Sequence, residues 1–133
     1  MSTIVGTGGG AATAAGMDFQ HRVGAHILSS VLCGLPTNAA LQFAVLSKIS
    51  AVHFETGGLV DDLNVYLADG SRVFVQAKRT IHFSDLGTSP FWAVIKSFAD
   101  NFLRHADEVP IHLLAVSPDC NAPMGRRQIS WFR

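Results

Sequence analysis

The chain has 133 residues, 48% of them hydrophobic and 15% charged, which fits one folded domain and excludes a disordered chain. Ten basic residues balance ten acidic ones, so no overall basic excess marks a nucleic-acid-binding protein. No apolar run is long enough to cross a bilayer and no secretory signal opens the chain, so we expect a cytoplasmic protein with no membrane partner. Cys33 and Cys120 are expected to be free thiols.

Residues 1–15 are rich in glycine and alanine and predict a flexible leader. The run from Ile4 to Ala11 matches the spacing of a dinucleotide-binding loop, G-x-G-x-x-A. That motif needs a full strand before it and an acidic residue about twenty positions after it, and the sequence has neither. A nucleotide-binding domain built on this leader is therefore the least supported of three functional interpretations.

Residues 17–33 predict a helix, because apolar side chains recur at every fourth position: Phe19, Val23, Ile27 and Val31, with Leu28 and Leu32 widening the stripe. Gly34 and Pro36 end this helix. Residues 37–43 are expected to form a loop.

Three strands are expected next, over residues 44–54, 60–67 and 72–79, and the turn residues Ala68-Asp69-Gly70-Ser71 join the last two as a hairpin. Ser89-Pro90 then opens a helix, with Ser89 as its cap. Its predicted buried stripe is Phe91, Ile95, Phe98 and Phe102, with Trp92, Val94 and Leu103 beside it.

Residues 111–116 predict a short buried strand. The elements predict an α/β domain over residues 16–117, with the order α-β-β-β-α-β and a mixed sheet flanked by helices. Residues 118–133 are expected to be a tail that ends a fragment or leads to a further domain.

The hairpin carries the residues that indicate chemistry. Its first strand begins at Asp61-Asp62 and its second ends at Gln76-Ala77-Lys78, so antiparallel pairing brings the two groups to the same end of the sheet. If the turn has three residues, with the glycine left-handed, the apolar positions of the two strands share one face of the sheet. Asp62 then lies on the other face with Gln76 and Lys78. A two-residue turn would place Asp61 there instead. We favour Asp62, and Asp61 stays open.

These residue types suit metal-dependent cleavage of a phosphodiester. Mg²⁺ prefers oxygen ligands, which Asp62, the amide of Gln76 and the carbonyl of Ala77 would supply, and Mn²⁺ can use the same set. Lys78 would orient the attacking water and stabilise charge on the phosphate. Other residues are expected at the edge of the site: Glu55 as a second carboxylate, Gln20 in the cleft, and Arg72 and Arg79 on phosphates.

The pattern Gly16-Met17-Asp18-Phe19-Gln20, then Glu55, Asp61-Asp62-Leu63 and Val75-Gln76-Ala77-Lys78, resembles the PD-(D/E)xK nuclease superfamily. It is most similar to the Mrr-like branch that carries Gln-x-Lys, and to the double-stranded-DNA endonuclease domains of bacterial anti-phage effectors. The resemblance implies a restriction-endonuclease-like fold, catalytic roles for Asp62, Gln76 and Lys78, and a site role for Glu55. It also implies a fused or separate NTPase or nucleotide-sensing domain.

The leading interpretation is thus a magnesium-dependent DNA endonuclease, expected to form a homo-oligomer because a duplex needs two cuts. The alternative is a catalytically inactive module on the same fold that binds DNA or a partner protein. No acid in the middle of the first helix, and glutamine at position 76, motivate this alternative.

Overall fold

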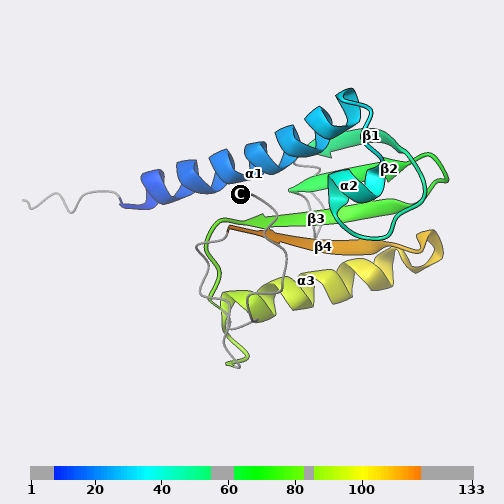
Figure 1. Ribbon diagram of the computed structural model, residues 1–133. Coiled ribbons are helices and arrows are strands. Elements are labelled where there is room, and N and C mark those ends of the chain that lie inside the picture. The colour runs from blue at the N-terminus through cyan, green and yellow to red at the C-terminus, as the bar shows by residue number, and fades with distance from the viewer. Residues whose placement is uncertain (1–7, 55–61, 83–85, 118–133) are drawn as a thin grey trace, which may run out of the picture.

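The computed structural model describes residues 8–54, 62–82 and 86–117. They form an α/β domain with a four-stranded mixed sheet, in which β1 (Ile49–Phe54), β2 (Leu63–Leu67) and β3 (Arg72–Lys78) are antiparallel neighbours and β4 (Ile111–Val116) runs parallel to β3. The helices are α1 (Gly8–Leu32), α2 (Thr37–Leu41), α3 (Pro90–Arg104) and the single 3₁₀ turn η1 (Ala106–Glu108). The predicted fold class and α-β-β-β-α-β order are confirmed (Figure 1).

The core lies on one face of the sheet, called the first face here. Alternate strand residues Leu63, Val65, Val73 and Val75 are almost fully buried there, packed with α1 and α2. Burying each such side chain stabilises the fold by about 1.5–3 kcal/mol. From α1 the predicted residues Phe19, Val23 and Ile27 join this core, whereas Val31, Leu28 and Leu32 are exposed, so the predicted wider stripe is wrong at that end.

Helix α1 begins earlier than the sequence suggested. Residues 8–15, which we expected to be a flexible leader, are helical, and residues 1–7 lie outside the described residues. The four alanines at positions 11, 12, 14 and 15 have the highest helix propensity, which offsets the cost of about 1 kcal/mol for each helical glycine. None of the helices in the described part of the chain has the length and hydropathy that a bilayer span requires.

The segment between α1 and β1 also differs from the expectation. Residues 37–41 form the short helix α2 rather than a loop, and β1 starts at Ile49 rather than at residue 44. Gln42 ends α2 in the left-handed conformation, which turns the chain before Val45 packs into the core. Helix α1 approaches β1 closely at Gly24, where an added Cβ would displace the ring of Phe54.

The β2–β3 hairpin has the predicted three-residue loop. Leu67 accepts from the N–H of Gly70 and donates to Ser71, and Gly70 is left-handed with φ 88°. Asp69 accepts from both the N–H and the hydroxyl of Ser71, and these bonds, the hydroxyl's first, hold the pKa of Asp69 below its usual value. The resulting register pairs Leu63 with Val75 and Asn64 with Phe74, so the second face of the sheet carries the polar positions.

Helix α3 lies on the second face, on the opposite side of the sheet from α1 (Figure 1). Its start is as predicted: Ser89 caps the helix by accepting from the N–H of Trp92, and Pro90 takes the first helical position. The predicted buried stripe is only partly right. Val94 is buried and Phe91 and Phe98 are half-buried, but the sheet reaches only one side of the helix and leaves other predicted members exposed: Trp92, Ile95, Phe102 and Leu103.

Candidate metal and nucleic-acid site

Asp62 and Gln76 meet at the end of the sheet where β2 begins and β3 ends. Continuing the register by one residue beyond Leu63–Val75 places Asp62 opposite Gln76. The Gln76 amide Nε2 donates to Asp62 Oδ2 at 2.7 Å, and the N–H of Ala77 donates to the same oxygen at 2.7 Å. Both distances are at the short end of the range for N–H···O bonds, as expected for a carboxylate acceptor.

Gln20 fixes the same aspartate from the other side of the site. It lies on α1, is only 8% exposed, and donates through Nε2 to the backbone carbonyl of Asp62 at 3.0 Å. The first helix therefore positions the point at which β2 starts. Because the Gln20 amide is buried and hydrogen-bonded, it holds the backbone of Asp62 in one orientation with little conformational freedom.

A cleft opens beside these residues. It has a volume of about 390 Å³, within the usual range for ligand sites, and its lining residues are Ala15, Gly16, Met17, Gln20, Asp62, Ala77, Lys78, Arg79 and Thr80. Figure 1 shows α1 extending past the ends of β2 and β3, and the residues of α1 that line the cleft are Ala15, Gly16, Met17 and Gln20. Lys78 and Arg79 both line this cleft, and within the described residues neither forms an ion pair.

The donor set fits a hard divalent cation. N–H and C=O of one strand residue point toward the same neighbouring strand, so the Ala77 carbonyl, like its N–H, is directed to the Asp62 side. Asp62 contributes a carboxylate, and the Gln76 amide carries an oxygen beside its nitrogen. Three oxygen types and room for water match Mg²⁺. In the described residues no three His, Cys, Asp or Glu side chains converge as a metal cluster, and Asp62 is the carboxylate among the described residues that line the cleft.

Two predicted site residues, Asp61 and Glu55, lie outside the described residues. Arg72 does not join the site, although it was expected to contact phosphates with Arg79. It starts β3 while Lys78 ends it, which separates the two by about 20 Å of strand at 3.3 Å per residue. The sequence grouped them because both flank the hairpin, but they flank opposite ends.

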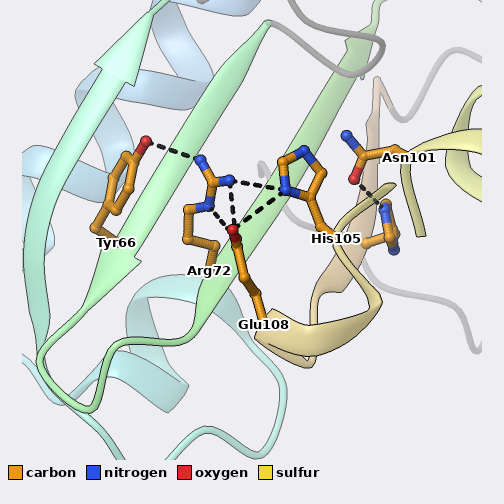
Figure 2. A network of polar contacts seen from close by, with 6 residues as sticks. Tyr66, Arg72, Asn101, His105 and Glu108 are labelled. Carbon is orange, nitrogen blue, oxygen red and sulfur yellow. Dashed lines mark hydrogen bonds and ion pairs between the residues drawn. The ribbon is translucent and has the colours of Figure 1, made fainter. Parts of the chain in front are cut away.

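At its own end of the hairpin Arg72 is the centre of a closed polar network (Figure 2). Its guanidinium donates to Glu108 Oε2 from Nε at 3.0 Å and lies 2.9 Å from it through Nη2, and Nη1 donates to the Tyr66 hydroxyl at 2.9 Å. It also stacks over the rings of Tyr66 and Phe74. The Arg72 side chain is only 17% exposed, so these contacts fasten η1 to the sheet.

Two histidines extend this network into the packing of α3. His105 Nδ1 lies 3.1 Å from Arg72 Nη2 and 3.4 Å from Glu108 Oε1, while His112 Nε2 bonds to Asn101 Oδ1 at 2.8 Å. Burial, and then the charge of nearby His105, lower the pKa of His112. Desolvation acts to raise the pKa of Glu108, but the bonds and charges of His105 and Arg72 outweigh it and lower the value.

The sequence did not identify two parts of this arrangement. Met17 and Thr80 line the cleft, and only knowledge of where α1 starts places a full helical turn before Gln20 at the site. The Arg72–Glu108 pair spans 36 positions in the chain, and no local pattern signals a contact of that range. Comparison with known protein families, with curated proteins and with solved structures found no match to this chain.

Proposed function

We propose that this chain is a metal-dependent endonuclease domain that hydrolyses phosphodiester bonds of double-stranded DNA in bacterial anti-phage defence. The observation that supports this best is the convergence of Asp62, Gln76, Ala77 and Lys78 at one end of the hairpin, beside an open cleft that also presents Arg79. A carboxylate and two cations that gather on one hollow are candidates for a site that acts on a phosphate. The defence role rests on the resemblance of the sequence alone.

Asp62, the Gln76 amide oxygen and the Ala77 carbonyl would hold Mg²⁺ or Mn²⁺, with Glu55 as a further ligand that the resemblance implies. Such an ion, when bound, neutralises charge on the phosphate and lowers the pKa of a water. The protein's own groups orient the reactants. Gln20 fixes the backbone of Asp62, and Gln76 and Ala77 fix its carboxylate, so the ligands are held before the substrate arrives.

Lys78 is the residue that we propose to act on the reacting phosphate. It follows Ala77 at the end of β3 and lines the cleft, where its ammonium would donate to a phosphate oxygen and to the attacking water. Arg79 would contact a neighbouring phosphate. Because these are contacts to the backbone of the nucleic acid, binding should weaken steeply with salt and depend little on base sequence.

The experiment is cleavage of supercoiled plasmid by the purified chain with Mg²⁺, with Mn²⁺ and with EDTA. Lys78→Ala should reduce the rate by about 10²-fold or more, the scale of losing one donor to the transition state. Lys48→Ala is the matched control, because Lys48 is exposed and lies outside the cleft. Equal cleavage rates for the two variants, or cleavage that persists in EDTA, would contradict the proposal.

The alternative is a module on the same fold that binds DNA or a partner protein without cutting. One observation favours it: position 76 holds an amide that donates to Asp62, where a second carboxylate would bind a cation more strongly. A plasmid that stays intact while the folded protein retards it in a gel would support this reading. The partners implied by the resemblance, an NTPase or nucleotide-sensing domain, belong to the same set of proposals.

A further inference from the structure

Helix α3 has two apolar stripes, and the sheet covers only one of them. The inner stripe follows the spacing of a helix packed on one partner: the apolar residues Phe91, Val94 and Phe98, continued by polar Asn101 and by His105, the C-cap of the helix. Its members contact β3 and β4, since the ring of Phe98 lies 5.1 Å from that of His112 and Asn101 bonds to the same histidine (Figure 2). This stripe accounts for the attachment of α3 to the sheet.

The outer stripe has no cover in the described part of the chain. It runs through Trp92, Ile95, Ala99, Phe102 and Leu103, and the four large side chains are 40%, 37%, 50% and 74% exposed in that order. At about 100° per residue it lies roughly a third of a turn from the inner stripe, so the apolar residues from Val94 to Leu103 occupy about 180° of the helix circumference. A helix that packs on one surface needs only about half of that.

The outer stripe also borders a hollow of about 440 Å³ whose lining includes Trp92, Ile95, Lys96 and Ala99. The four large side chains expose roughly 400 Å² of apolar surface, if each offers about 200 Å² in full. A patch of this size lies within the range of the largest apolar patches on monomers, which often mark interaction surfaces. It supplies about half of the roughly 800 Å² per partner of a stable interface, and the polar flanks of α3 would add to it.

We propose that a second copy of this chain covers the outer stripe of α3, with the two α3 helices antiparallel about a two-fold axis at Ala99. Ile95 and Leu103 of the stripe each lie four positions from this residue. Antiparallel pairing therefore sets Ile95 of one copy against Leu103 of the other. The small side chain at the crossing lets two helix axes approach to about 8 Å.

The charges beside the stripe fit the same partner. Lys96 precedes Ala99 by three residues and Asp100 follows it by one, so in the antiparallel pair the two are offset by only about 3 Å along the axis, at 1.5 Å per residue. The two-fold axis places the flank that carries Lys96 and Asp100 on the same side of the interface in both copies. Lys96 of each copy then reaches Asp100 of the other, which gives two equivalent ion pairs. An unrelated partner would not need this self-complementary arrangement.

The interface would leave both clefts open, since α3 and the cleft-forming start of α1 lie on opposite faces of the sheet (Figure 1). Two clefts related by a two-fold axis are what cutting both strands of a duplex requires, and this consequence alone rests on the proposed function. Association itself is measured without DNA, so a failure of the dimer and a failure of the nuclease are separate results.

The first test is a disulfide across the axis. In a Cys33→Ser, Cys120→Ser background, Ala99→Cys should give a covalent dimer under mild oxidation at micromolar protein. Arg104→Cys, on the solvent side of the same helix, should cross-link at least tenfold more slowly. Equal cross-linking of the two variants would overturn the proposal, because only residue 99 is predicted to face itself.

The second test is the mass in solution by light scattering and sedimentation. The chain should be dimeric at tens of micromolar, and Leu103→Asp should be monomeric, while Leu46→Asp should remain dimeric because Leu46 is fully exposed and far from α3 in sequence. Lys96→Asp should weaken the dimer about tenfold, and adding Asp100→Lys should restore it. A monomeric wild type, or a dimer that Leu103→Asp leaves intact, would refute the interface.

Discussion

Both ends of the β2–β3 hairpin carry polar side chains on the second face of the sheet, but they use them differently. At the turn end, Arg72, Tyr66, His105 and Glu108 bond to one another in a closed network. At the other end, Asp62 and Gln76 form a pair beside a cleft into which Lys78 is placed with no ion-pair partner among the described residues. Closed networks fasten elements together, whereas open ones with a cation and a carboxylate are available to a ligand.

Removing the carboxylate at the cleft should have the largest effect. Asp62→Ala deletes a proposed metal ligand and leaves the Gln76 amide and the Ala77 N–H without their acceptor. We expect cleavage to fall by about 10³-fold and the free energy of unfolding to fall by about 1–3 kcal/mol. Plasmid assays and urea denaturation measure the two quantities. Unchanged cleavage would mean that the hairpin end is structural.

Breaking the network at the turn end should change stability and leave chemistry alone. Arg72→Ala removes the bonds to Glu108 and Tyr66 and should lower the free energy of unfolding by about 1–3 kcal/mol. Arg72→Lys should recover only part of the loss, because an ammonium cannot reproduce the fork of the guanidinium. Urea denaturation of the three proteins decides this. If Arg72→Ala proved as stable as wild type, the network would not fasten η1.

A carboxylate at position 76 should make stability depend on the metal. Gln76→Glu would set two carboxylates at the 2.7 Å contact now made by the amide, and like charges this close disfavour ionisation of both. We expect a lower melting temperature in EDTA and a gain of several degrees on adding Mg²⁺, larger than for wild type. A melting temperature insensitive to Mg²⁺ in this variant would argue against a metal site.

The smallest expected effect is the change of stability at acidic pH, which we attribute to residues at the turn end of the hairpin. Because the folded pKa of His112 is lowered from 6.5, its neutral form is favoured in the fold, so stability falls as pH drops below about 6.5. The lowered pKa of Glu108 adds stability above 4.5 that is lost on further acidification. His112→Gln keeps a bond to Asn101 and should flatten the melting-temperature curve between pH 7 and 5.5. A curve as steep as that of wild type would contradict this assignment.

The hairpin shows how much a local pattern can predict. The loop Ala68-Asp69-Gly70 needed one left-handed residue, glycine supplied it, and the register then paired Asp62 with Gln76 as expected. The bounds of the strand over residues 111–116 and the Ser89 cap were predicted correctly for the same reason, although the strand is mostly half-buried rather than buried as expected. Each depends on neighbours in the sequence, where propensity and alternation act directly.

The features that the sequence did not predict depend on contacts between residues that are far apart in the chain. Hydrophobic spacing on α3 predicted a buried helix, but spacing does not tell which of two apolar stripes the sheet covers, and Ile95 and Phe102 proved exposed. The early start of α1 reflects a balance of alanine and glycine propensities that the glycine-rich appearance concealed. The partners of Arg72 come from β2, α3 and η1, so only the fold assigns this residue to stability.

The most direct test of the difference between the two hairpin ends is one series of plasmid-cleavage rates in Mg²⁺ for wild type, Lys78→Ala and Arg72→Ala. The rates are normalised to the fraction of folded protein. We predict a loss of about 10²-fold or more for Lys78→Ala and a rate within about twofold of wild type for Arg72→Ala, since its contacts bear on folding alone. Equal losses in the two variants, or no metal-dependent cleavage by folded wild type, would contradict the account.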